Sequence, residues 1–584
     1  LFEELLELDY RYFVSDAEKN WTERTVNLQT DFISMGVELV EDYFPRVTQD
    51  ADLDDVDQTF DPEKYKLNLN RGNAADNLFS STDNRNGFEV NLKANYQLGG
   101  FSATTKVGGH FDFRNKEFLR DFNRFSTVEV DPLPQISLAD PEFFGGPLET
   151  GFLSDRPEFE FGPSFSNKTT NAFFDDPGDV EFVQEGDDVT FNVTDAILKN
   201  YLATEDVLAG YFMQTLEKGS LKIIAGFRFE ETRNTFTNTE ILTRPEGLPI
   251  PFVLPAFWER LPLEEFSQQV TSEKSYTHFM PAFHLRKEFG EKTVVRASYT
   301  QTIARPRFTN LVPREIVSID GSTFGTAVAL PNFDLAPMES KNVDLSFERY
   351  FEGLGLVSVA GFYKKLTGPI YLERRTVDVG TELSAKLAAK YDQRGRDDDP
   401  WTTNQWRNAG DGEILGVEVA FEKKLNFLPW PFDGLGVSFN TAFIDSNVQI
   451  LLEERFEEEL PMFKQSSNLG NFSIYYEKSG LLVRLAMVWR GKYLDPRGVR
   501  GGKVDIKDIT ERHELPANSL DVYVDDFVKL DLTIRYRIRD HFTVFFEATN
   551  LTDEPLRRYE GDTSRLHSIQ FTDTIFSLGL KWNL

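Results

Sequence analysis

Strict alternation between apolar and polar residues runs through long parts of this 584-residue chain. Three segments show it most clearly, namely residues 527–539, 542–548 and 574–584. Within the first segment, Val528 and Leu530 share one face, and Lys529 and Asp531 share the other. A period of two residues is typical of a β-strand with one apolar face. Because such strands need partners on both sides, we expect a closed barrel, which leaves no edge unpaired.

The connections between these strands alternate in length. Phe88–Leu98 and Phe101–Phe113 are joined by the two-residue turn Gly99–Gly100, and a long polar segment follows. The same order of short and long connections continues to the last residue. We count about fifteen clear strands and about three weak ones, as expected for an outer-membrane β-barrel with short turns on one side. A soluble sandwich or propeller would rarely place loops of about 20–90 residues at every second connection.

Composition excludes several classes of protein. The chain has no Cys, which rules out disulfides and Cys-ligated metals. Its net charge of −32 argues against nucleic-acid binding, because phosphate recognition needs a basic surface. No apolar run approaches the roughly 18 residues of a membrane-spanning helix, whereas strands of about 10 residues are long enough to cross at a tilt. We interpret the acidity as solvated loops.

The polar face of the alternating strands carries many charges. In contact with lipid each Arg or Lys would cost about 2–4 kcal/mol at mid-depth. We therefore expect this face to line an enclosed lumen and the apolar face to meet lipid. The charged residues concerned are Lys93, Lys106, Arg228, Arg296, Glu418, Arg484, Arg535 and Glu547.

The N-terminal part gives a weaker signal than the remainder. Residues 1–85 predict early barrel strands and loops, with alternation around Val26–Phe32 and Tyr65–Leu69, and residues 86–584 predict the main barrel. Leu1–Glu4 lacks the basic start of a signal peptide, and the first residue is not Met. We therefore expect a processed polypeptide or a part of a longer one.

Several segments, taken in order, resemble the barrel of TonB-dependent outer-membrane receptors. The resemblance extends over roughly residues 200–584 and is strongest in 290–370 and 525–584. The segments are Val294–Tyr299 followed by Ala304–Phe308, Asn332–Pro337, Ser340–Tyr350, Gly361–Lys365 and Glu547–Asp553. It implies an all-β, antiparallel up-and-down transmembrane barrel of about 22 strands, plugged by an N-terminal domain. No plug and no TonB box is recognisable here, so we expect the plug and the first strands to be missing from this chain.

The family resemblance also implies partners and a location. It implies a multi-pass barrel in the outer membrane, in contact with its lipid and lipopolysaccharide, that receives energy from the TonB–ExbB–ExbD complex through a plug. A surface lipoprotein is a further candidate partner. The end of the chain resembles the signal read by the barrel assembly machinery, with the apolar residues Phe576, Leu578, Leu580, Trp582 and Leu584.

Motifs for catalysis or metal binding are weak. Gly321–Gly325 has Thr at the position that a hydrolase nucleophile would occupy, and no phosphate-binding loop is present, so we expect neither an enzyme nor a cofactor. His278 and His284 lie about 20 Å apart on one strand, too far to share a metal. Four aspartates could ligate calcium, although the spacing lacks the required Gly and Glu: Asp50, Asp52, Asp54 and Asp57.

Aromatic residues in the long loops are the best candidates for ligand binding, because their rings can stack on sugars or aromatic chelates. They are Phe143, Phe144, Phe173, Phe174, Trp258, Trp401 and Trp406. Three functions remain open. The chain is an energy-coupled importer of a scarce ligand such as a ferric siderophore, a vitamin or an oligosaccharide. Alternatively it is a passive porin or structural barrel, or a soluble all-β carbohydrate-binding protein.

Overall fold

The computed structural model describes most of the strands and part of the connections. The described residues are 6–26, 28–30, 34–40, 44–50, 65–67, 74–127, 182–183, 200–241, 267–311, 316–319, 326–330, 332–353, 355–377, 380–391, 401–451, 458–495, 500–501, 521–539 and 541–582. Within them, no helix has the length and apolar character needed to cross a membrane.

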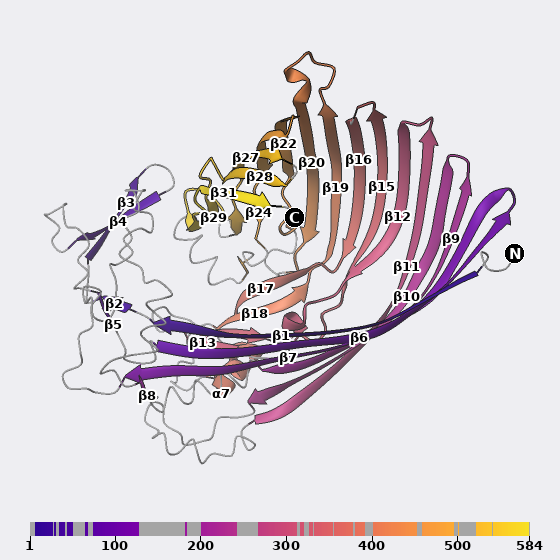
Figure 1. The fold of residues 1–584 in the computed structure, drawn as a ribbon. Coiled ribbons are helices and arrows are strands. Elements are labelled where there is room, and N and C mark those ends of the chain that lie inside the picture. The colour runs from indigo at the N-terminus through magenta and orange to yellow at the C-terminus, as the bar shows by residue number, and fades with distance from the viewer. Residues whose placement is uncertain are drawn as a thin grey trace.

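One large antiparallel sheet dominates the fold (Figure 1). It contains 18 strands, of which β8 (Phe182–Val183) and β21 (Glu459–Leu460) are short. The other strands, in chain order, are β1 Leu6–Val26, β6 Ala74–Leu98, β7 Phe101–Thr127, β9 Tyr201–Lys218, β10 Leu221–Ile241, β11 Ser267–Phe289, β12 Thr293–Ala304, β15 Met338–Phe351, β16 Gly355–Thr367, β19 Asp411–Lys424, β20 Leu435–Gln449, β22 Asn468–Lys478, β23 Leu481–Arg490, β27 Phe527–Arg539, β28 Phe542–Thr549 and β31 Ile575–Trp582.

Each long strand pairs with its neighbours in the chain, which confirms the predicted up-and-down order. The sheet curves around a hollow but is not closed (Figure 1). In the described part of the chain, β1 pairs with β6, and β31 pairs with β28. No register with a second strand is found there for either of them. The predicted closure is therefore not seen, because both outermost strands keep one unpaired edge.

β1 also differs from the prediction for the N-terminal part. It begins at Leu6 and runs for 21 residues, well before the alternation predicted around Val26–Phe32. Its outward residues Leu8, Tyr10 and Tyr12 are all more than half exposed. Single polar residues separate Leu6, Leu8, Tyr10 and Tyr12, so this alternation is present in the sequence, although it was not predicted.

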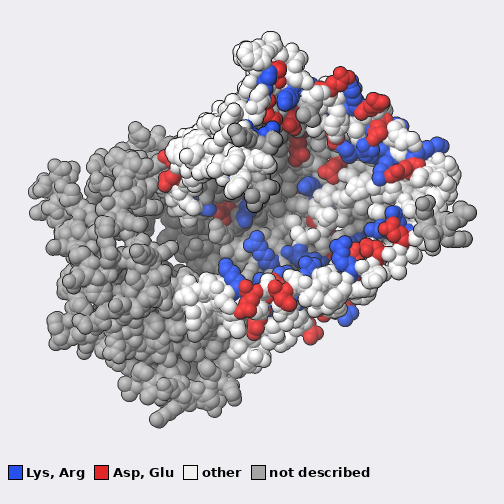
Figure 2. Space-filling model, viewed as in Figure 1, with Lys and Arg blue, Asp and Glu red and all other residues white. Residues whose placement is uncertain are grey.

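Two ends of the sheet differ in their connections. At the turn side, tight turns such as Gly99–Gly100, both with positive φ, join consecutive strands. At the loop side, the long connections begin and end. Outward-facing side chains are apolar and exposed, for example Leu345, Leu415 and Phe279, each with an exposed fraction near 58%. Charged residues line the hollow on the other face (Figure 2), where Lys93 pairs with Glu7 at 3.0 Å.

The loop side carries smaller sheets that pack on the strand ends. One has the order β13 (Ile316–Ile319), β14 (Thr326–Leu330), β18 (Trp401–Asn408), β17 (Ile370–Val377) and β25 (Arg500–Gly501). Another joins β24 (Tyr493–Leu494), β26 (Val522–Val524), β29 (Leu556–Glu560) and β30 (Leu566–Gln570). Two short pairs are β2 (Leu28–Thr30) with β5 (Tyr65–Leu67) and β3 (Ser34–Val40) with β4 (Phe44–Asp50). The helices among the described residues are short: α6 Phe308–Leu311, α7 Glu382–Tyr391 and the 3₁₀ turn η3 Phe432–Gly434.

Buried apolar residues concentrate at this loop side. One cluster joins Tyr371 to Val448, Ile450 and Leu494, which come from three separate parts of the chain. A second joins Tyr201, Phe236, Phe308, Leu311 and Leu335. Since these clusters unite β17, β24 and α6 with the ends of long strands, these three loop-side elements pack on the large sheet.

Candidate ligand-binding site in the lumen

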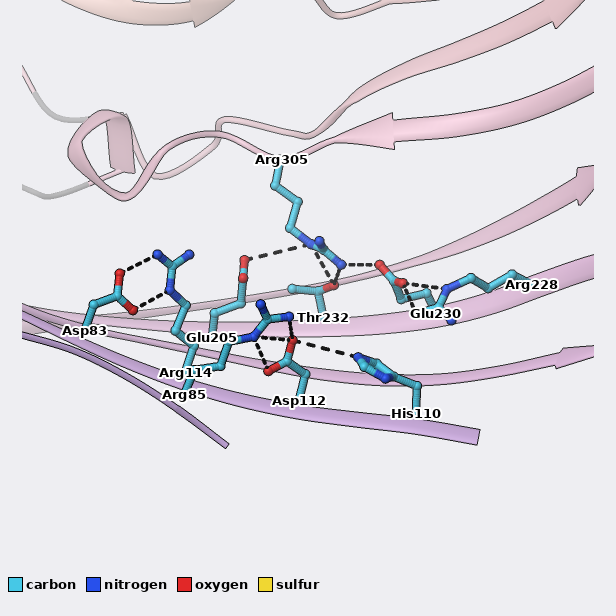
Figure 3. A network of polar contacts seen from close by, with 10 residues as sticks. All are labelled: Asp83, Arg85, His110, Asp112, Arg114, Glu205, Arg228, Glu230, Thr232 and Arg305. Atoms are coloured by element: carbon cyan, nitrogen blue, oxygen red, sulfur yellow. Dashed lines mark hydrogen bonds and ion pairs between the residues drawn. The ribbon is translucent and has the colours of Figure 1, made fainter. Parts of the chain in front are cut away.

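A network of charged side chains lies on the inner face of β6, β7, β9 and β10, toward their loop-side ends (Figure 3). Alternation places these side chains inward, and register aligns them. Arg85, Arg114 and Glu205 are direct neighbours across three strands. The outward residues beside it include the exposed rings of Phe113 and Phe229 as well as a polar pair, Arg233 and Glu231, 2.8 Å apart on the outer face of β10. The network therefore lies toward the mouth of the lumen, where the outer apolar band gives way to polar residues.

Arg85 and Asp112 form the first part of the network. The Nε of Arg85 donates to both carboxylate oxygens of Asp112, at 2.8 and 2.9 Å. The Nε2 of His110 lies 3.8 Å from the same carboxylate. Asp112 is buried, so this bidentate contact compensates for the loss of water around its charge.

Arg114 and Asp83 form the second part. The Nε and Nη2 of Arg114 donate to the two carboxylate oxygens of Asp83 at 2.8 and 2.5 Å, and Lys116 lies 3.6 Å away. The guanidinium carbon of Arg114 also lies 4.9 Å from the ring centre of Phe308 in α6. This cation–π contact joins the charged wall to the apolar cluster of the loop side.

Arg305 joins the remaining members. It follows β12 directly and reaches toward β9 and β10 (Figure 3). Its guanidinium contacts Glu230, lies 3.8 Å from Glu205 and donates to the hydroxyl of Thr232 at 3.3 Å. Glu230 is only 5% exposed and also pairs with Arg228 at 2.8 Å. Two guanidinium groups thus satisfy one buried carboxylate.

A small pocket lies beside Arg305. Its walls mix apolar and polar side chains, namely Asn234, Phe236, Ser272, Glu273, Lys274, Tyr276, Pro306, Leu311, Phe333 and Leu335. The ammonium of Lys274 donates to the backbone oxygen of Leu335 at 2.8 Å. Asn234 is buried, and no hydrogen bond reaches its side-chain oxygen. The pocket wall therefore contains a side-chain oxygen that can accept a hydrogen bond.

A second polar cluster lies in the loop-side sheet, outside the large sheet. The hydroxyl of Tyr371 donates to Glu373 at 3.3 Å, and the Nε of Arg407 lies 3.3 Å from the same carboxylate. Burial raises the pKa of Tyr371, and the negative charge of Glu373 raises it further. The phenol therefore stays protonated and serves as a hydrogen-bond donor.

Of the aromatic residues predicted to bind ligand, only Trp401 and Trp406 are among the described residues. Phe143, Phe144, Phe173, Phe174 and Trp258 lie outside the described residues. Trp401 is 6% exposed and packs with Val377 and Leu387, so it has little surface left for a ligand. Trp406 packs against the cluster around Phe308. The structure thus places both described tryptophans in apolar packing.

The other candidate residues are distributed as follows. Phe576, Leu578, Leu580 and Trp582 form the exposed outward row of β31, and Leu584 lies outside the described residues. Of the four aspartates that could ligate calcium, Asp52, Asp54 and Asp57 also lie outside the described residues. Asp50 is the last residue of β4. Within the described chain, no group of His, Asp and Glu has the geometry of a metal site.

Sequence reasoning did not identify Glu205, Glu230, Asp112 or Arg305 as members of one site. A signal was available, because charged residues recur on the inward face near the loop-side ends of adjacent strands. What the sequence lacks is the register, which decides which of these charges meet.

Comparison with known proteins agrees with this architecture. The family model described as TonB-dependent receptor-like β-barrel matches residues 17–551. The closed form of the ferric-catecholate import receptor Fiu from E. coli K12 shares 12% identity, with a TM-score of 0.51, over 98% of this chain and 64% of that one. None of the curated proteins matches the sequence.

Two further solved structures are similar at lower TM-scores. The ferric preacinetobactin receptor BauA from Acinetobacter baumannii has 11% identity and a TM-score of 0.48, covering 100% of this chain and 61% of its own. The ferric citrate transporter FecA has 10% identity and a TM-score of 0.49, covering 88% and 56%. This chain thus spans less than two thirds of the length of these receptors. With the family model covering most of its residues, the chain belongs to the TonB-dependent receptor β-barrel family.

Proposed function

We propose that this chain forms the barrel of an outer-membrane receptor that imports a scarce ligand by energy-coupled transport. The ligand is a ferric siderophore, a vitamin or an oligosaccharide. Its action is binding and passage rather than the making or breaking of bonds. Energy comes from the TonB–ExbB–ExbD complex through a plug domain within the barrel, and the surrounding lipid and lipopolysaccharide hold the outer face.

The observation that carries this proposal is the contrast between the two faces of the sheet. Apolar side chains cover the outer face, while the inner face at the lumen mouth holds a network of paired charges around Arg305 and Glu230. A wall of this kind keeps its shape when the lumen is wet, since each buried charge has a fixed partner. The pocket with the unsatisfied oxygen of Asn234 lies next to it.

The outward row of β31 supports a second part of the proposal. Phe576, Leu578 and Trp582 are each more than 60% exposed along one edge of the sheet. We assign this row to recognition by the barrel assembly machinery. A surface lipoprotein covering the loop side is a further candidate partner, because ligand capture occurs on that side.

Uptake by a deletion strain tests the import function. Cells lacking the receptor should grow more slowly than the parent on one ligand class, supplied as ferric siderophores under iron limitation, as vitamins or as defined glycans. Mass spectrometry of ligands bound to the purified full-length receptor identifies the compound. Restoring the receptor in cells without ExbB and ExbD should not restore uptake. Full uptake in those cells would instead identify a passive porin, and unchanged uptake of every ligand after deletion would argue against import.

A further inference from the structure

The connection between β19 and β20 differs from the other connections of the turn side. Described turns such as Gly99–Gly100 and Gly290–Lys292 have two or three residues, whereas this one extends over Leu425–Gly434 and contains η3. It projects beyond the neighbouring turns (Figure 1). Three large apolar side chains on it face solvent: Phe427 is 71% exposed, Trp430 78% and Phe432 56%. We call these three residues the aromatic knob.

The aromatic knob is held firmly despite its exposure. The amide of Leu425 donates to the backbone oxygen of Leu435 at 2.8 Å, and the amide of Phe432 donates to that of Pro429 at 2.9 Å. The ammonium of Lys478, at the turn side of β22, binds both carboxylate oxygens of Asp433 at 2.5 and 2.7 Å. The lysine hydrogen bond holds the pKa of Asp433 below its usual value, so this contact persists at neutral pH.

Residues next to the aromatic knob mark the depth of the membrane boundary. Lys423 lies on the outward face of β19, in line with Leu415 and Val417, yet its ammonium turns back to donate to the backbone oxygen of Glu352 at 2.6 Å. An outward lysine that bends toward the barrel end is typical of the boundary between acyl chains and headgroups. It also lies over the ring of Phe351, at 5.9 Å.

Outward aromatic residues continue along this boundary on other strands. Phe289 at the end of β11 and Phe351 at the end of β15 are 57% and 43% exposed, and Phe542 stacks on Trp582 with ring centres 5.6 Å apart. Rows of aromatic residues at the ends of the apolar band lie at the membrane interface in outer-membrane barrels. The aromatic knob begins at Phe427, four residues beyond Lys423, and the amide of Leu428 donates back to the backbone oxygen of Leu425 at 3.0 Å. Because the connection folds back in this way, its residues stay near the strand ends, within reach of a headgroup layer of about 5–7 Å.

We propose that the aromatic knob is a membrane anchor that inserts into the headgroup region of the periplasmic leaflet. Short turns face the periplasm in barrels of this type, so this leaflet is the one within reach. Its occupant is phospholipid, because the knob continues the aromatic row of the wall and Lys423 and Lys424 lie beside it. Contact with lipid removes from water the three apolar side chains that the anchored connection exposes.

Site-specific fluorescence tests this proposal, because the chain has no Cys. Trp430→Cys in the full-length receptor is labelled with a polarity-sensitive dye and reconstituted in vesicles of phosphatidylethanolamine and phosphatidylglycerol. Glu291→Cys, in the short turn between β11 and β12, is the matched control. At position 430 we expect emission shifted to the blue, strong quenching by brominated acyl chains and weak quenching by iodide. The control should show the reverse order of quenching.

A measurement without labelling covers the case in which the cysteine variant does not fold. Tryptophan emission of the unmodified receptor minus that of Trp430→Phe gives the signal of Trp430 alone, and brominated lipid should quench it. A Trp430 signal quenched by iodide but not by brominated lipid would overturn the proposal. So would a signal that becomes shielded only after a periplasmic protein fraction is added, which would identify a protein partner instead.

Discussion

Arg305→Ala removes the guanidinium that links Glu205, Glu230 and Thr232 at the mouth of the lumen. Removing one partner of a buried ion pair costs about 3–5 kcal/mol, because the other charge stays buried. Here Glu230 keeps Arg228 at 2.8 Å, and Arg305 itself is 29% exposed. We therefore expect a loss of about 2–3 kcal/mol in the free energy of unfolding.

Urea unfolding of the full-length receptor in lipid vesicles, followed by tryptophan fluorescence, measures this loss from the midpoint and slope. Arg233→Ala is the matched control, since Arg233 pairs with Glu231 on the outer face and is 68% exposed. It should change stability by at most about 0.5 kcal/mol. Adding Glu230→Gln to Arg305→Ala should recover part of the loss, because the uncompensated charge disappears. Equal losses for both arginines, or a double variant as unstable as the sum, would refute the reasoning.

Three further outcomes are expected. Gly226→Ala should lower the free energy of unfolding by about 1–3 kcal/mol, because the added Cβ would collide with a backbone oxygen of β9. Gly361→Ala is the control: its added Cβ would lie 3.9 Å from the nearest atom, so it should be nearly neutral in the same unfolding assay. The lowered pKa of Asp433 means that its contact with Lys478 stabilises the fold above the unfolded-state pKa and is lost as pH falls through the folded-state pKa. The stability difference between the receptor and Asp433→Asn should therefore shrink on acidification, and a constant difference would contradict this. Trp401→Ala should lower the free energy of unfolding by about 3–5 kcal/mol, because removal of the buried ring leaves a cavity. Trp401→Phe should keep ligand uptake. Selective loss of uptake in a stable Trp401→Phe receptor would instead indicate that Trp401 contacts the ligand.

Much of the large sheet was predictable, because alternation is a local property. Val528 and Lys529 lie on opposite faces whatever the rest of the chain does, and the turn Gly99–Gly100 fixes the register of its hairpin. The sequence also indicated correctly that Lys93 and Arg296 face the lumen, where they pair with Glu7 and Glu348. The alternation that begins at Leu6 was not predicted, although single polar residues separate Leu8, Tyr10 and Tyr12.

The loop side was less predictable, because it depends on contacts between distant segments. Nothing near Trp401 in the sequence indicates that it packs with Leu387 of α7. The link between Arg305 and Glu230 joins residues 75 positions apart, one just after β12 and the other in β10, and these two strands are not neighbours. Such contacts follow from the curvature and register of the whole sheet, which no single segment encodes.

The clusters at the loop side carry a consequence for how ligand preference can change. Tyr371, Ile450 and Leu494 belong to three different connections, yet they share one buried core with Val448 at the end of β20. Connections that share a core open and close together as one cooperative unit. Exchanging a single loop for that of a relative would therefore disturb its neighbours as well, so new specificity is more readily reached by substitutions at exposed tips than by replacing whole loops.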